Sequence, residues 1–199
     1  MKTREPDTTV PSDMQKISEP RIGLIGNIND IVDMDLLVYL AEQKPEWSII
    51  LIGNINGSSW FLNSQSFLRC KEISNIYLMG FRNYETLPSY QKGLNVCLLP
   101  YLINKYTLNV YPSKVHQYLA GGKPVVSTDL PEMRPLEDII HISNSYEEFL
   151  RLCNESLHLT SPEIVEKRIA VAKENSIEAR AKIKIELLYA TINMQRKTG

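Results

Sequence analysis

The sequence has few of the features that mark disulfide-rich, metal-binding or membrane-spanning proteins. Among its 199 residues only three are cysteines, and Cys70, Cys97 and Cys153 are too far apart for a metal-ligand motif or a disulfide framework. No apolar run approaches the roughly 20 residues that a transmembrane helix needs. The N-terminus also lacks the apolar core of a signal peptide. These absences predict a reduced, cytoplasmic protein.

Positive and negative charges are almost balanced in this sequence. The formal net charge is −1, so no overall electrostatic attraction to nucleic acid or to an anionic membrane is expected. Hydrophobic residues make up 43% of the chain, which is typical of a globular domain with a real core. Residues 1–19 are polar and contain prolines, and we predict that this flexible tail or linker buries too little surface to become ordered.

From residue 20 onward, short apolar segments rich in Ile, Val and Leu alternate with helical patterns. The apolar segments lack polar–apolar alternation, as strands buried on both faces of a parallel sheet do. Helix signals include a proline at the start and two glycines at the end of residues 112–120, and a capping box at residues 145–148. Residues 54–71 are ambiguous and are interpreted as a loop with one helix. The predicted strands are residues 22–26, 47–53, 76–80, 96–100, 124–128 and 139–142, and the predicted helices are residues 33–44, 84–92, 112–120 and 146–154.

This alternation predicts an α/β fold with a Rossmann-like parallel sheet of about six strands and helices on both faces, over residues 20–160. Residues 161–199 lack strand signals and are predicted to be a C-terminal helical extension of the same domain. A helix begins near residue 161, and a second carries an apolar stripe that must pack on this domain, meet another chain or stay partly exposed. The stripe consists of Ile177, Ala181, Ile185, Leu188 and Ile192.

Ligands of open parallel sheets bind outside the carboxyl ends of the strands, which directs attention to four loops. These are residues 26–30, 80–83, 100–111 and 128–132. The first contains Gly26 and Asn27, whose backbone N–H groups could approach a ligand, although a plain strand–helix turn explains the glycine equally well. The third is longer than a simple connection needs, which is typical of functional loops.

The helix predicted after the third loop places Ser113, Lys114 and Gln117 on adjacent positions of its first turns. Free N–H groups at a helix start, together with Lys114, would suit a phosphate group. The amide of Gln117 can both donate to and accept from hydroxyl groups. A solvated surface lysine is the simpler alternative for Lys114.

Residues 111–132 resemble the signature of GT-B glycosyltransferases of the GT4 type. The family's segment reads approximately P-x-K-x-x-E-Y-L-A-x-G-K-P-V-V-S-T-x-L-P-E, and this chain has YPSKVHQYLAGGKPVVSTDLPE. Three more segments, residues 20–26, 75–90 and 174–180, are similar to family motifs in the same order. The chain therefore resembles the C-terminal, donor-binding domain of such an enzyme from about residue 20 to its end.

The resemblance implies that the domain holds a nucleotide-diphosphate sugar of UDP or GDP type as substrate, with no cofactor and no metal. The family's E-x7-E carboxylates, which lie near the donor sugar with its phosphates and at the ribose, correspond to Asn109 and Gln117. Base recognition in the family comes from the loop after the third strand, here Phe81 and Arg82. The nucleotide-sugar-binding residues implied by position are Gly26, Asn27, Phe81, Arg82, Asn109, Ser113, Lys114 and Gln117; catalytic residues are unassigned.

The sequence departs from the family pattern at two sets of ligand-binding positions. Many relatives carry an arginine and a lysine after the first strand, where this chain has the sequence NIND at residues 27–30. Lys114, Arg82 or Lys105 would have to supply the missing positive charge. Both carboxylates of the E-x7-E motif are amides, and neutral hydrogen bonds have roughly half the strength of charge-assisted ones.

Complete enzymes of this family also have an N-terminal Rossmann-like domain that binds the acceptor, and only about 20 polar residues precede the predicted domain. The expected function is donor binding in a hexosyltransferase-type glycosyltransferase of surface polysaccharide or glycoconjugate synthesis, inactive without an N-terminal domain or partner chain. The alternative is a non-catalytic nucleotide-sugar-binding or scaffold protein. An epimerase and a receiver-like domain fit less well, because their acidic residues are not found. Peripheral membrane association of the full enzyme and a homodimer through the C-terminal helices stay open.

Overall fold

The computed structural model describes residue 5, residues 7–158 and 161–176, and residues 179, 181–182 and 184–187. Its centre is a six-stranded sheet in which all neighbours run parallel, in the order β3-β2-β1-β4-β5-β6. The predicted α/β, Rossmann-like fold and its six strands are confirmed. The strands are β1 (Arg21–Ile25), β2 (Ser48–Ile52), β3 (Ile76–Gly80), β4 (Val96–Leu99), β5 (Val125–Thr128) and β6 (His141–Ser143).

The inner strands show why the sequence carries continuous apolar runs. Every residue of β1, β2, β4 and β5 is buried, so both faces of these strands contact other parts of the protein. β3 and β6, at the two edges of the sheet, contain partly exposed residues. When both faces of a strand are buried, the residues that point to either face must be apolar. Polar–apolar alternation therefore disappears.

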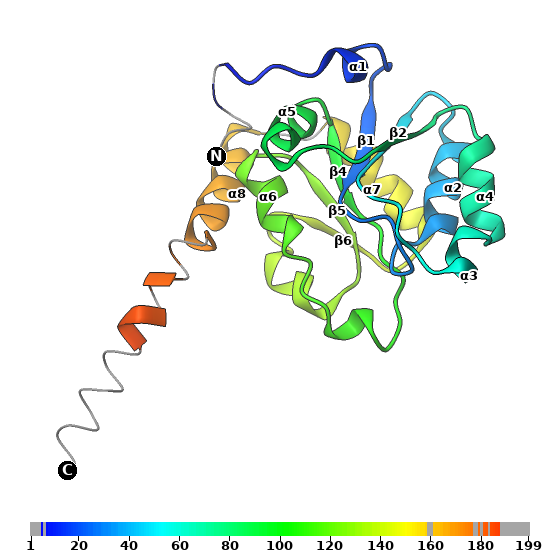
Figure 1. Ribbon diagram of the computed structural model, residues 1–199. Coiled ribbons are helices and arrows are strands. Elements are labelled where there is room, and N and C mark those ends of the chain that lie inside the picture. The colour runs from blue at the N-terminus through cyan, green and yellow to red at the C-terminus, as the bar shows by residue number, and fades with distance from the viewer. Residues whose placement is uncertain are drawn as a thin grey trace.

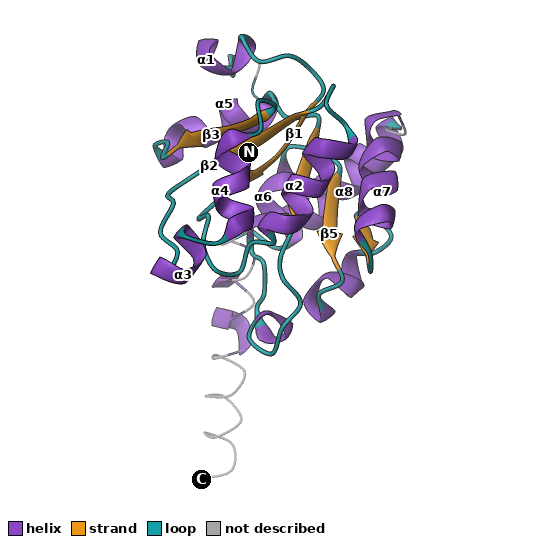
Figure 2. Cartoon of the chain, turned by 90° about the vertical axis from the view of Figure 1, so that its right-hand side faces the viewer, coloured by secondary structure: helices purple, strands orange, loops and turns teal. Residues whose placement is uncertain are grey.

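Helices cover both faces of the sheet, as predicted. In Figure 1, α5, α6 and α8 lie to the left of the sheet and α2 and α4 to its right, and Figure 2 shows α2, α4 and α7 in front of the strands. The helices are α1 (Ser12–Gln15), α2 (Met34–Gln43), α3 (Ser59–Leu62), α4 (Gln65–Glu72), α5 (Leu87–Lys92), α6 (Lys114–Ala120), α7 (Tyr146–His158) and α8 (Pro162–Glu174), with the short 3-10 turns η2 (Tyr84–Thr86), η3 (Thr107–Asn109) and η4 (Pro131–Leu136).

Residues 54–71, interpreted as a loop with one helix, instead lead into two helices. The side chain of Ser58 accepts a hydrogen bond from the Phe61 N–H at the start of α3. Ser64 accepts one from the Phe67 N–H at the start of α4 in the same way. Two serine N-caps six residues apart divide the segment, because each satisfies a backbone donor that would otherwise lack a partner.

The N-terminal segment is more ordered than its composition indicates. Within residues 1–19, predicted as a flexible tail or linker, the short helix α1 buries Met14 completely. Asp13 beside it accepts hydrogen bonds from Arg82 and from the hydroxyl group of Tyr90. One apolar anchor and one ion pair thus hold this polar segment against the domain, although residues 1–4 and residue 6 lie outside the described part.

Two predicted features at the C-terminus have different outcomes. The helix expected near residue 161 is α8, and the side chain of Ser161 caps it by accepting from the Ile164 N–H. Three residues of the apolar stripe lie outside the described residues: Ile177, Leu188 and Ile192. Ile185, which the structure does describe, is exposed.

The cysteines are all free and buried, in agreement with the sequence. Burial raises the pKa of the Cys70 and Cys97 thiols to about 12. Over the described ranges no group of His, Cys, Asp and Glu side chains is arranged to hold a metal ion. A search of the same residues finds no helix that is long and apolar enough to cross a membrane.

Gly53 makes a close backbone contact that shapes the carboxyl edge of the sheet. Its φ is +147°, and a Cβ atom there would lie 1.8 Å from the carbonyl oxygen of Gly26. Its N–H donates to the Gly80 carbonyl at 3.0 Å. Glycine is needed here because the loops after β1 and β2 approach more closely than any side chain permits.

We expect Gly53→Ala to lower the free energy of unfolding by more than about 3 kcal/mol, since the overlap involves backbone atoms that cannot move aside. Gly80→Ala is the matched control, because Gly80 also has positive φ, +71°, but a Cβ there meets nothing within 4 Å. It should cost only about 1–2 kcal/mol. Urea unfolding followed by circular dichroism measures both values, and equal losses would contradict the steric explanation.

Candidate functional site

The candidate site lies where β1 and β4 separate. The two strands pair only at Ile22 with Val96 and at Gly23 with Cys97, and the chain order of the sheet reverses between them. Such a switch point opens a crevice outside the carboxyl ends of the two strands. The loops that leave this edge, the lower one in Figure 1, are residues 26–30 after β1 and residues 100–111 after β4.

A buried tyrosine bridges the end of β1 and α6. The Tyr118 hydroxyl accepts a hydrogen bond from the Ile25 N–H at 2.8 Å and lies 3.3 Å from the Ile25 carbonyl oxygen, to which it donates. Tyr118 is 1% exposed, and burial raises its pKa well above the ordinary value. The hydroxyl thus satisfies the backbone of Ile25 beyond the last paired residues of β1 and β4, and it fixes α6 against the end of β1.

Lys114 lies one helical turn before Tyr118. Because Tyr118 holds α6 against Ile25, the Lys114 side chain crosses the next residue of the chain, Gly26. A Cβ atom on Gly26 would be 2.5 Å from Cε of Lys114 and 3.4 Å from its Nζ. The side chain is partly buried, and burial lowers the pKa of the amine. Across the described residues its ammonium group makes no salt bridge and no hydrogen bond, so a positive charge lies unpaired over the switch point.

The backbone donors at the start of α6 are less available than the sequence suggested. The N–H groups of Ser113, Val115 and His116 donate to the carbonyl groups of Tyr111, Pro112 and Ser113. The helix begins at Lys114 rather than at Pro112, because a tight turn precedes it. The positive charge at this point therefore comes mainly from the lysine side chain.

The long loop after β4 is held by its own side chains. The Asn104 side chain accepts from the N–H groups of Tyr106 and Thr107, and the Thr107 hydroxyl accepts from the Asn104 N–H at 2.9 Å. Thr107 is fully buried. The loop is thus a defined structure that presents Asn109 at its exposed end.

The two amides that replace the family's carboxylates are both exposed to solvent. The Asn109 amide donates to the Lys105 carbonyl at 2.9 Å, which orients it. Gln117 lies on α6, and its backbone carbonyl accepts from the buried side chain of Gln91. Asn27 and Ser113 are also exposed, next to the contact between Gly26 and Lys114.

Phe81 and Arg82 follow β3 and differ in availability. Phe81 is 60% exposed. The Arg82 guanidinium forms a salt bridge with Asp13 at 2.9 Å and donates to the Tyr90 hydroxyl at 2.7 Å. The hydrogen bond to Asp13 raises the pKa of Arg82 above its ordinary value. Arg82 therefore already has an anionic partner, which reduces its value as a phosphate ligand.

Sequence reasoning missed Tyr118 and Asp13. Tyr118 is part of the quoted motif, but nothing local in the sequence indicates that its hydroxyl meets Ile25, 93 residues earlier. Asp13 lies in a segment whose composition predicted a tail. The short pattern of Asp13, Met14 and flanking prolines was the available signal, and it is too weak to predict a contact with Arg82.

Comparisons with known proteins find similarity to glycosyltransferases. No family model matches the chain. TuaH of Bacillus subtilis (strain 168), which carries the name of a teichuronic acid biosynthesis glycosyltransferase, is 29% identical over 116 residues, 58% of this chain and 28% of TuaH. The structure of Anabaena HepE in complex with UDP and glucose has a TM-score of 0.68 at 15% identity, with 90% of this chain and 52% of HepE covered.

A third similarity is to a domain alone. The C-terminal domain of the group 1 glycosyl transferase LpcC from Francisella tularensis has a TM-score of 0.55 at 13% identity, with 83% of this chain and 90% of that domain covered. The chain resembles the C-terminal domain of a group 1, GT-B glycosyltransferase, as predicted. The chain spans about half of HepE and just over a quarter of TuaH.

We expect Tyr118→Phe to destabilise the protein by about 1–3 kcal/mol, because it leaves the Ile25 N–H without this partner in a buried position. Tyr101→Phe is the control, since Tyr101 is also buried but its hydroxyl makes no hydrogen bond within the described residues. Its removal should change the free energy of unfolding by less than about 1 kcal/mol. Urea unfolding measures both, and equal effects would show that the Tyr118 hydroxyl is not a structural tie.

Proposed function

We propose that this chain is the donor-binding domain of a glycosyltransferase and that it binds the diphosphate of a nucleotide-diphosphate sugar beside Gly26 and Lys114. The observation that carries the proposal is the unpaired ammonium group of Lys114, which lies over Gly26 at the switch point of the sheet. This is the place at which open α/β sheets bind their ligands.

The electrostatics at this point favour an anion. A partly buried lysine without a counter-ion is unfavourable in the free protein, because burial removes water from the charge, and this is why its pKa is lowered. A phosphate group next to Nζ would restore a partner through charge-assisted hydrogen bonds. Gly26 contributes by having no side chain, so the stem of Lys114 can cross the backbone at the end of β1.

Other residues of the predicted site suit the remaining parts of a nucleotide sugar. The amides of Asn109 and Gln117 can donate to and accept from sugar hydroxyl groups without contributing charge. The exposed ring of Phe81 offers a stacking surface for a base. The loops that carry Asn27 and Ser113 border the contact between Gly26 and Lys114.

We further propose that transfer requires an acceptor-binding domain, in the same chain or in a partner. The covered share of HepE, about half, is consistent with a two-domain enzyme. Large apolar side chains are exposed in the segments that follow β2 and β4, where such a domain would face the donor site. They are Ile55, Trp60, Ile103, Tyr106, Leu108 and Tyr111. The name of TuaH supports a role in surface polysaccharide synthesis.

A second candidate function is nucleotide-sugar binding without catalysis. It is favoured by Asn109 and Gln117, because the loss of both carboxylates weakens contacts that catalytic relatives make. Radiolabelled sugar transfer by this chain joined to or mixed with an acceptor domain would separate the candidates. Binding with transfer supports the enzyme, and binding without transfer under all pairings supports the non-catalytic protein.

We expect UDP or GDP, and their sugars, to bind the full chain, and Lys114→Ala to weaken that binding about tenfold or more, as loss of a hydrogen bond to a charged group does. Gly26→Ala should also weaken it, because the new methyl group displaces the lysine stem without removing its charge. Lys44→Ala is the control, since Lys44 follows α2 and pairs with Glu46 at 3.6 Å.

Isothermal titration calorimetry gives the dissociation constants, with circular dichroism to verify folding of each variant. No binding of any of the nucleotides at millimolar concentration would exclude the donor-domain function for this chain. Unchanged affinity in Lys114→Ala would show that the diphosphate lies elsewhere.

A further inference from the structure

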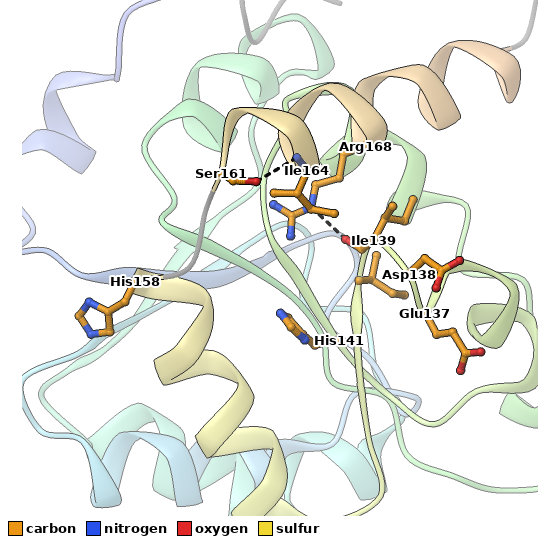
Figure 3. Close-up of a pocket in the computed structure, with 9 residues that line it drawn as sticks. Glu137, Asp138, Ile139, His141, His158, Ser161, Ile164 and Arg168 are labelled. Carbon is orange, nitrogen blue, oxygen red and sulfur yellow. Dashed lines mark hydrogen bonds between the residues drawn. The ribbon is translucent and has the colours of Figure 1, made fainter.

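A hollow lies at the amino edge of the sheet, opposite the edge that carries Lys114. It is formed where β6 begins, between the end of α7 and the start of α8 (Figure 3). Its volume is about 490 Å³, a size typical of small-molecule sites. It shares no lining residue with the proposed nucleotide-sugar site.

The hollow contains a buried guanidinium group with unused donors. Arg168 of α8 is only 2% exposed, and its Nε donates to the Ile139 carbonyl oxygen at 2.9 Å. Its Nη1 is buried and has no hydrogen-bond partner within the described residues. An unsatisfied buried donor on a charged group is unfavourable and is rare in folded proteins, unless a water molecule or an ion satisfies it.

Both polar and apolar side chains line the hollow around Arg168, and they come from different parts of its wall. Figure 3 shows the guanidinium pointing from α8 into the space bounded by His141, His158 and Ser161. Apolar lining comes from the residues just before β6 and from α8, through Ile140 and Ile164.

The two carboxylates in the lining do not neutralise this charge. Glu137 and Asp138 are exposed, and in Figure 3 their carboxylate groups point away from Arg168. No salt bridge joins either of them to Arg168 among the described residues. Among the described residues, the buried positive charge therefore forms no salt bridge.

We propose that this hollow is a binding site for a small organic anion, whose carboxylate or phosphate group pairs with the free edge of the Arg168 guanidinium and whose apolar part contacts the isoleucines.

The geometry fits this chemistry. The bond from Nε to Ile139 holds the guanidinium in one orientation and leaves Nη1 without a partner among the described residues. Paired N–H donors on a planar group match the two oxygens of a carboxylate or phosphate. A bound anion would also offset the desolvation that lowers the pKa of Arg168. Ring faces of His141 or His158 could cover the apolar part of the ligand.

This site is independent of the proposed donor function. The two sites lie at opposite edges of the same sheet and use different helices, α6 for Lys114 and α8 for Arg168. A failure to bind nucleotide would leave the anion site untouched, and the reverse also holds.

The test is a titration of the full 199-residue chain, followed by ¹⁵N–¹H NMR, with three probes: benzoate, inorganic phosphate and benzamide. Benzamide has the shape of benzoate without its charge. We expect saturable shifts of the amides of residues 139–141 and 161–168 with benzoate or phosphate, and at least tenfold weaker binding of benzamide. The stronger of the two anions identifies the head group.

Arg168→Gln should weaken anion binding at least tenfold. If that variant does not fold, Arg168→Lys keeps the charge but removes the paired donors, and the same direction is expected. Lys114→Ala, at the other edge, should leave these shifts unchanged. The proposal is overturned if neither anion gives saturable shifts, if benzamide binds as tightly as benzoate, or if the folded Arg168 variant binds as well as the natural chain.

Discussion

The hydrogen bonds between the Tyr118 hydroxyl and Ile25 are the tie on which the arrangement of the candidate site depends. β1 and β4 stop pairing after Gly23, and Ile25 needs another partner for its backbone. Because the partner comes from α6, the helix is fastened to the end of β1. The first turn of α6, with Lys114, then lies over Gly26. A parallel sheet that opens at its switch point thus acquires a positive charge at the opening.

Each of the two edges of the sheet carries a buried or partly buried cation for which no carboxylate partner is described. At the carboxyl edge Lys114 is partly buried without an anionic partner, and at the amino edge Arg168 is almost fully buried with an unused donor. By contrast, Arg82 and Arg134 each have a carboxylate within 3 Å. The paired cations stabilise local structure, whereas the unpaired ones are the natural places for an external anion.

The candidate site differs in charge from the family motif that the sequence resembles. Amides at Asn109 and Gln117 keep the capacity for hydrogen bonds, and the loop that carries Asn109 is firmly built around the buried Thr107. The fold similarity to HepE and LpcC concerns backbone arrangement at low identity. The proposed donor binding therefore relies on one lysine and neutral hydrogen-bonding groups in place of carboxylates.

The sequence by itself determined the six strands, their parallel arrangement and the loops at their carboxyl ends, and it made Lys114 a candidate ligand-binding residue. Apolar runs, helix caps and motif order are local patterns, and local patterns can be read without knowing which segments meet. Only the tertiary structure decided that Tyr118 satisfies Ile25, that Asp13 occupies Arg82 and that Arg168 is buried with a free donor. Each of these depends on a contact between segments distant in the chain, because burial and pairing of a polar group are set by its neighbours in space.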